Sequence, residues 1–361
     1  MVRFHWRLPQ SGAQPGMSRA HQNSLSDTGR PDLDAQIAFA RAAEDHGIDS
    51  LLIDFGWSKP DPILLATAIG MATSKVGFII AHRSGLTSPT AFVQQINTLS
   101  TLINGRFALN IVAGHSPAEQ RSYGDMLPHD ERYERTEEFL ALCRAFWKND
   151  GEVNFAGRYY CIEHGRVNTP FQSPTRTFPE LLIAGQSAAA QRLSVSQGTC
   201  WMRLADTPAR VAAEIGAVAD TGTEVGLRCA IVARPSHEEA VNAAQAIAAA
   251  AGTVFDDRRK EREFVAHTDS VSFKTVHQLA ETEWLTPCVW TGAVRSHGAA
   301  AIALVGSVQE ISSTLLEFGR VGVSQFILSG WPNLDEMQFF GRHVLPMVRE
   351  QEHAQLVPVP A

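Results

Sequence analysis

The sequence has little of what marks a membrane, secreted or disulfide-linked protein. No uninterrupted apolar stretch approaches the roughly 18 residues of a transmembrane helix. The first ten residues, MVRFHWRLPQ, lack the apolar core of a signal peptide. The five cysteines are an odd number and form no Cys-x-x-Cys pair. These absences predict a reduced, cytoplasmic protein with no membrane partner.

A strong positive charge is also missing. The chain of 361 residues has a net charge of −7, and its most basic run is DRRKER at 257–262. Because Asp256 and Glu263 flank this run, it is typical of a solvated helix face with mixed charge. We therefore expect no nucleic-acid partner.

Several catalytic motifs are absent as well. There is no P-loop, no His-Glu-x-x-His and no Gly-x-Gly-x-x-Gly after the first predicted strand. The stretch AGHSPAE (113–119) lacks the second glycine of a nucleophile elbow. His115 and His129 could converge, but no two histidines have the spacing of metal ligands, and we predict no metal site.

Strand and helix patterns alternate along the chain. Helix signals separate the strands; for example, Ser88 and Pro89 are typical of the first residues of a helix. Eight such units favour an α/β fold of the (β/α)8 TIM-barrel type over an open doubly wound sheet. The predicted strands are 2–8, 49–54, 75–83, 106–114, 179–185, 198–205, 225–233 and 324–330.

Two connections are too long for simple loops, and we expect a single barrel domain over 1–361 with two insertions. The insertions cover about 115–178, after strand four, and 235–323, after strand seven. Both would lie at the carboxyl ends of the strands, where barrel enzymes build their active sites. The part at 253–300 is our candidate for a mobile lid.

Two stretches at helix starts carry more chemistry than capping needs. LPHDERYERTEEF (127–139) contains His129 and Tyr133, which helix capping does not explain. AGQSAAAQRLS places Gly185 and Ser187 at a helix N-terminus, where free N–H groups favour a phosphate. A plain serine cap is the alternative interpretation of Ser187.

The chain resembles the bacterial luciferase-like flavin monooxygenases, most closely the alkanesulfonate monooxygenase branch. The resemblance is carried by SLLIDFG, SPTAFVQQINTLSTLINGRFALNIVAG, HDERYERTEEF, PELLIAGQS and FILSGWPNLDE, in this order over roughly 4–350. It implies a barrel that assembles as a homodimer or homotetramer. It also implies FMN as cofactor, used as FMNH2 with O2, and a separate NAD(P)H-dependent flavin reductase.

The resemblance also implies roles for individual residues. Tyr133 and Ser187 would contact the FMN phosphate, and Arg228 would stabilise negative charge in the active site. The expected cofactor-binding residues are Asp54, Ala81, Asn110, Ala113, Gly114, His129, Tyr133, Gly185, Gln186 and Ser187.

Departures from the branch concern the substrate pocket. Lys59 stands where the branch has a cysteine, His297 where it has a loop arginine, and Trp331 where it has a tyrosine. With Arg228 these three are the expected catalytic residues, although each could instead be a packing or loop residue. The gain of an indole and the loss of a phenol suggest a less anionic substrate than a simple alkanesulfonate.

The resemblance therefore predicts a two-component monooxygenase that oxygenates a small organic substrate through a C4a-peroxyflavin. The protein would supply positioning and exclusion of water, and the flavin the oxygen chemistry. An F420-dependent oxidoreductase of the same fold is one alternative. A non-catalytic flavin-binding barrel and a metal-dependent barrel hydrolase are two others.

Overall fold

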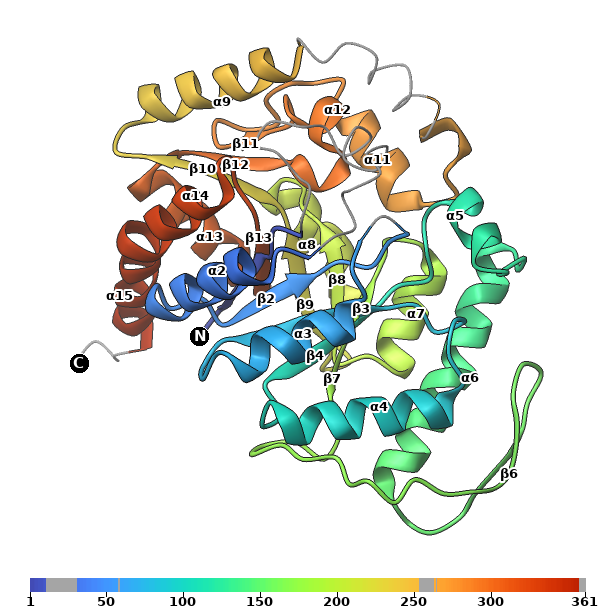
Figure 1. Ribbon diagram of the computed structural model, residues 1–361. Helices are drawn as coiled ribbons and strands as arrows, with labels where there is room; N and C mark the ends of the chain where they lie inside the picture. Colours follow the sequence, from blue (N-terminus) through green and yellow to red (C-terminus); the bar gives the residue numbers. More distant parts are fainter. Residues whose placement is uncertain (11–30, 58, 253–262, 264, 357–361) are drawn as a thin grey trace, which may run out of the picture.

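Eight parallel strands close into a barrel in the computed structural model, which describes residues 1–10, 31–57, 59–252, 263 and 265–356 (Figure 1). The order around the barrel is β1-β13-β9-β8-β7-β4-β3-β2. The strands are β1 (Arg3–Arg7), β2 (Ser50–Ile53), β3 (Gly77–His82), β4 (Phe107–Ile111), β7 (Glu180–Ala184), β8 (Cys200–Leu204), β9 (Glu224–Arg228) and β13 (Val323–Leu328). The predicted (β/α)8 fold is confirmed.

Helices cover the outside of the barrel and begin where the sequence has capping residues. Asp32, Asp61, Ser88 and Ser187 each accept a hydrogen bond from the backbone N–H three residues later. The main helices are α2 (Leu33–Asp45), α3 (Pro62–Met71), α4 (Pro89–Leu102), α6 (His129–Lys148), α7 (Ala188–Ser196), α8 (Pro208–Ala219), α13 (Val308–Arg320), α14 (Asn333–Phe339) and α15 (Leu345–Leu356). None of the helices in these described ranges is long and apolar enough to cross a membrane.

The predicted strand 225–233 is correct only up to Arg228, where the barrel strand β9 ends and the chain leaves the barrel. A second strand, β10 (Ala230–Arg234), pairs instead with β12 (Ala303–Ser307), which also pairs with β11 (Val289–Trp290). This three-stranded sheet lies beside α9 (His237–Gly252) at the top of Figure 1. Two of its strands, β11 and β12, belong to the second insertion, which also contains α11 (Val271–Leu279) and α12 (Val294–His297).

The first insertion contains α5 (Pro117–Ser122), α6 and a hairpin of β5 (Val153–Ala156) and β6 (Cys161–Gly165). The hairpin projects away from the barrel in Figure 1. Arg158 at its tip contacts Glu131 at 2.7 Å and Glu134 at 2.8 Å, and Glu138 accepts the Arg158 backbone N–H at 2.8 Å. The acidic face of α6 therefore anchors the hairpin.

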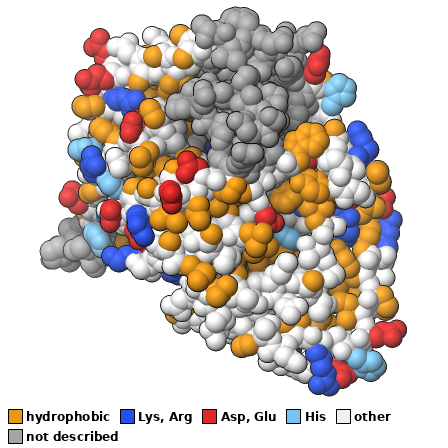
Figure 2. Space-filling model, in the orientation of Figure 1, with side chains coloured by type: hydrophobic (Ala, Val, Ile, Leu, Met, Phe, Trp, Pro, Cys, Tyr) orange, Lys and Arg blue, Asp and Glu red, His pale blue; other side chains and the backbone are white. Residues whose placement is uncertain are grey.

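Two neighbouring helices, α3 and α4, contain no charged residue. Leu64 and Met71 of α3 are 70% and 66% exposed, and Leu102 of α4 is also exposed. Figure 2 shows hydrophobic side chains on the face of the molecule that carries α3. Large apolar side chains on an uncharged surface are typical of protein contacts.

Candidate functional site

A cavity opens at the carboxyl ends of the barrel strands. It contains about 1090 Å³ of space between atoms, and this volume includes open solvent. Ten of its residues are the ten that we predicted to bind the cofactor, and Arg228 also lines it. These residues come from β2, β3, β4, β7 and β9 and the segments that follow them, because the ends of parallel strands meet at one edge of a barrel.

The N-terminus of α7 forms one side of the cavity. The Ser187 hydroxyl caps the helix by accepting the Ala190 N–H at 3.2 Å. The hydroxyl groups of Ser187 and Tyr133 lie near each other, and the Ser187 hydroxyl lowers the pKa of the phenol. Burial has the larger effect and raises the pKa of Tyr133, so the phenol stays protonated at neutral pH. Two hydroxyl groups thus lie at the positive end of a helix dipole.

Gly185 leaves the space beside these hydroxyl groups open. It has φ +138°, which L side chains rarely adopt, and an added Cβ would lie 2.8 Å from the Tyr133 oxygen. Gly114, with φ +88°, has a different constraint: there a Cβ would lie 2.5 Å from Gln120, so packing rather than the cavity requires this glycine. His129 begins α6, and its ring centroid lies 5.1 Å from that of Tyr133.

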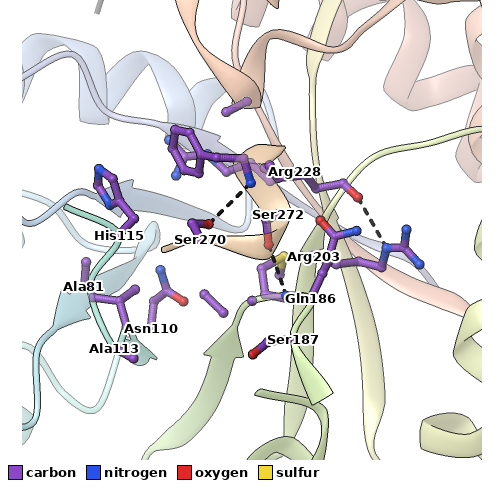
Figure 3. Close-up of a pocket in the computed structure, with 18 of the residues that line it drawn as sticks. Ala81, Asn110, Ala113, His115, Gln186, Ser187, Arg203, Arg228, Ser270 and Ser272 are labelled. Atoms are coloured by element: carbon purple, nitrogen blue, oxygen red, sulfur yellow. Dashed lines mark hydrogen bonds between the residues drawn. The ribbon is translucent and has the colours of Figure 1, made fainter. Parts of the chain in front are cut away.

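The cavity wall contains two buried side-chain oxygens, Asn110 Oδ1 and Gln186 Oε1. Neither has a hydrogen bond within the described part of the chain. Burying such atoms without a partner costs about 1–3 kcal/mol each. Asn110 lies near Ala81 and Ala113, whose short side chains leave room for a flat group, and Gln186 lies across the view from them, near Ser187 (Figure 3). The site therefore fits a ligand with a phosphate at one end and a flat, polar ring at the other.

A segment of the second insertion also lines this cavity, and the sequence did not indicate which of its residues would do so. Ser270, Val271, Ser272 and Phe273, at the start of α11, line it. Gln186 donates its backbone N–H to Ser272 Oγ at 3.0 Å, a hydrogen bond drawn in Figure 3. These residues fall within the predicted lid 253–300; of that range, 253–262 and 264 lie outside the described residues.

Two further contacts attach this segment to the barrel. Arg132 of α6 donates to Asp269 Oδ2 at 2.6 Å and to the Ala113 carbonyl at 3.0 Å. His115 stacks on Phe273, with ring centroids 4.9 Å apart, and its carbonyl accepts the Thr268 hydroxyl. Arg132 belongs to the stretch HDERYERTEEF, but only the fold shows that it joins three distant segments.

The other predicted catalytic residues lie apart from the main cavity wall. Lys59 lines an adjoining groove beside α3, and its Nζ lies 3.1 Å from Asp54 Oδ2. His297 and Trp331 contact each other, with ring centroids 5.0 Å apart, but neither lines the cavity. Burial lowers the pKa of His297 to about 4, so its ring is neutral at pH 7. The catalytic roles of these residues stay predictions.

A metal site would need a different arrangement of side chains. His115 and His129 both line the cavity. Within the described ranges, no three His, Cys, Asp or Glu side chains come together as metal ligands would.

Comparisons with known proteins agree with the family resemblance seen in the sequence. The model of the luciferase-like monooxygenase family matches residues 13–325. A solved structure of riboflavin lyase (RcaE), with modified FMN and its substrate riboflavin, superposes with a TM-score of 0.78 at 20% identity. The match covers 98% of this chain and 92% of that one.

Two other solved structures have the same fold. EDTA monooxygenase (EmoA) from Chelativorans sp. BNC1 has a TM-score of 0.70 at 20% identity, covering 97% of this chain and 94% of that one. An F420-dependent secondary alcohol dehydrogenase has a TM-score of 0.66 at 17% identity, covering 96% and 99%. At these identities the structures show the shared barrel alone.

Proposed function

Because this chain belongs to the luciferase-like monooxygenase family, we propose that it is the oxygenating component of a two-component flavin monooxygenase. It would take FMNH2 from a separate NAD(P)H-dependent flavin reductase and use O2 to oxygenate a small organic substrate. Its place in the alkanesulfonate monooxygenase branch, with a substrate other than a simple alkanesulfonate, is likewise our proposal from the motifs and their departures.

One observation supports the proposal. The same cavity contains a helix N-terminus with two hydroxyl groups and a wall of small residues and of polar residues whose side-chain oxygens have no hydrogen bond within the described part of the chain. The α7 N-terminus, Ser187 and Tyr133 would hold the phosphate of FMN. Asn110 and Gln186 would give hydrogen bonds to polar atoms of the flavin ring. Bound reduced flavin would supply the reaction with O2. The chain would supply positioning and the exclusion of water.

The residues of the second insertion would exclude water. Val271 and Phe273 present apolar side chains to the cavity, and Thr268, Asp269 and Ser272 attach their segment to the barrel. Displacing water strengthens the electrostatic interactions inside the site and protects reactive species from loss. The lid is therefore proposed to act over 268–273.

Titration with FMN, FMNH2 and F420 tests the cofactor. The proposal expects FMN and FMNH2 to bind in the micromolar range or tighter, and O2 to be consumed when a flavin reductase and NADH are added. Preferred binding of F420, with hydride transfer and no use of O2, would support the alternative suggested by the F420-dependent neighbour. Absence of both activities would leave a non-catalytic flavin-binding barrel.

We also propose that the chain assembles as a homodimer or homotetramer. The uncharged surface of α3 and α4, with Leu64 and Met71 exposed, supports a contact between copies. Light scattering on the purified protein decides this, since a monomer at micromolar concentration would exclude it.

A further inference from the structure

A buried ion pair joins the barrel to the sheet of the second insertion. Glu336 of α14 is 2% exposed, and its Oε1 accepts a hydrogen bond from Arg234 Nη1 at the end of β10. Its Oε2 accepts the Ala233 N–H at 3.4 Å. The helix α14 lies beside β10 in Figure 1, although 102 residues separate Arg234 from Glu336 in the sequence. We call this contact the α14–β10 joint.

The helix side of the joint is fastened to the barrel. Gly330, just after β13, lets Glu336 approach closely, because an added Cβ would clash with the Glu336 side chain. Asn333, at the start of α14, accepts Trp6 Nε1–H at 2.7 Å and donates its side-chain amide to the Arg7 carbonyl at 2.9 Å. The N-terminus of α14 is therefore held on β1.

The strand side of the joint leads to the cavity. Ala230, at the start of β10, donates its N–H to the Ile302 carbonyl at 2.7 Å, and β10 pairs along its length with β12. Ile302 directly follows the short helix Ala299–Ala301, and Ala300 lines the cavity. The joint therefore lies one strand away from a wall of the proposed active site.

The surroundings of Glu336 compensate its charge poorly. Within the described residues its oxygens contact one cation, Arg234, whose side chain is 27% exposed. The Ala233 N–H lies at the outer limit of a hydrogen bond. Moving a charge out of water costs more than one such partner repays. Burial accordingly raises the pKa of Glu336 to about 7.

Other titratable groups near the joint act more weakly or in the opposite sense. Asp335, the exposed neighbour of Glu336 on α14, repels its charge and adds a little to the shift. His297 contacts Trp331 between the same two parts of the chain, and burial lowers its pKa to about 4. The charged residues of α2 and 340–344, which also pack against α14 and are not among the main causes of the shift, are Asp34, Arg41, Glu44, Asp45, Arg342 and His343.

We propose that Glu336 is a positioning residue of the cavity: by joining α14 to β10, it determines how firmly the wall at Ala300 is held against the barrel. The inference rests on the proposed function for its effect on flavin, and it deepens that function by naming a residue outside the cavity that controls access. Ligand entry needs the wall to open, and exclusion of water needs it to close.

Proton linkage gives the α14–β10 joint a pH dependence. When the joint opens, Glu336 meets water and regains its ordinary pKa of 4.5. Between pH 4.5 and about pH 7, the closed joint therefore holds a proton that the open joint has released. Rising pH weakens the joint through this window, and the effect is complete above pH 7. The wall is held most firmly when Glu336 is protonated.

Glu336→Gln tests the joint, because glutamine is neutral like the protonated carboxyl group and keeps an oxygen for the Arg234 and Ala233 donors. Hydrogen–deuterium exchange compares peptides over 230–234 and 299–305 in the FMN-free parent chain and variant. Both proteins are measured at the same pH, so intrinsic exchange rates and the effect of His297 cancel. The ratio of the parent rate to the variant rate should rise tenfold or more from pH 5.0 to pH 7.5.

A merely structural ion pair predicts the reverse. Such a pair would strengthen as Glu336 ionises, so the variant would lose a charge-assisted bond at pH 7.5 and exchange faster than the parent chain.

A second variant and a matched control assign the effect to this pair. Arg234→Gln removes the cation that opposes the shift, so the pKa of Glu336 should rise further and the loss of protection should extend to higher pH. The same pH window in Arg234→Gln would contradict the assignment. Glu350→Gln removes an exposed carboxylate of α15 and should follow the parent chain.

The rate of FMN release, measured by fluorescence, separates the joint from the proposed function. Release from the parent chain should accelerate relative to Glu336→Gln over the same pH range. An exchange ratio that stays constant or falls overturns the joint and leaves the proposed function standing. A rising ratio with unaffected FMN release overturns the positioning role. A rising ratio with no FMN binding to either protein overturns the proposed function and leaves the joint standing.

Discussion

A methyl group on Gly185 would lie 2.8 Å from the Tyr133 hydroxyl oxygen and 2.9 Å from Ala190 Cβ. The strand β7 thus turns into α7 at a point where only glycine leaves both the hydroxyl and the helix N-terminus accessible. The backbone of Gly185, just after β7, therefore lies close to the side chain of Tyr133, which belongs to the first insertion.

Gly185→Ala is therefore expected to weaken FMN binding by tenfold or more, because the new methyl occupies the proposed phosphate site and φ +138° strains an L residue. Fluorescence titration of FMN measures the change. Gly216→Ala is the matched control: its Cβ would meet no atom within 4 Å, and alanine suits the interior of α8 better than glycine. Equal FMN affinity in both variants would contradict the proposed position of the phosphate.

Tyr133→Phe removes one hydroxyl group and little volume. The expected result is an FMN dissociation constant raised about tenfold, the usual effect of losing one hydrogen bond to a charged group. Tyr159→Phe is the control, because the Tyr159 hydroxyl binds Glu134 at the hairpin, away from the cavity. If both variants bind FMN like the parent chain, Tyr133 serves only to pack α6 against α7.

The barrel could be predicted because its strands are buried on both faces and are therefore continuous apolar runs. For the same reason the sequence does not show that the barrel strand ends at Arg228. The runs of β9 and β10 have the same character, and only the pairing of Ala230–Arg234 with Ala303–Ser307 shows that they belong to different sheets. A local pattern reports burial but does not identify the partner strand.

The residues that line the cavity could be predicted for a related reason: residues at the carboxyl ends of parallel strands meet wherever a barrel closes. Ser270 to Phe273 could not, because their place in the cavity depends on contacts with Arg132, His115 and Gln186 made by a long insertion.

Asp269→Asn tests the attachment of the covering segment. The substitution removes the negative charge that meets Arg132 Nη2 at 2.6 Å. Peptides over 268–273 should then exchange amide hydrogen about tenfold faster, and FMN should dissociate more rapidly, whereas exchange in the barrel strands stays unchanged. Hydrogen–deuterium exchange with mass spectrometry measures this.

The matched control for this exchange experiment is Asp150→Asn, which removes the exposed pair with Lys148. It should leave exchange over 268–273 unaltered. Unaltered exchange in Asp269→Asn as well would mean that the remaining contacts of Thr268 and Ser272 are sufficient to attach the segment.

His82 makes the stability of the barrel depend on pH. Its ring lies buried against Phe92, with centroids 3.9 Å apart, and burial lowers its pKa from 6.5 to about 3. Between these two values the unfolded chain binds a proton that the folded chain does not, so the stabilisation is complete above pH 6.5 and is lost as pH falls towards 3. At pH 4.5 the loss from this group is about 2–3 kcal/mol.

His82→Leu should remove that part of the pH dependence. Urea unfolding at pH 7.5 and pH 4.5 gives the free energy of unfolding at each pH. The variant should lose less stability between the two than the parent chain, even if its stability at pH 7.5 is lower. His5 keeps a smaller dependence of the same sign, because burial lowers its pKa to about 4. His353→Leu, on the exposed end of α15, should follow the parent chain. Equal losses in all three proteins would show that His82 takes up its proton without unfolding the barrel.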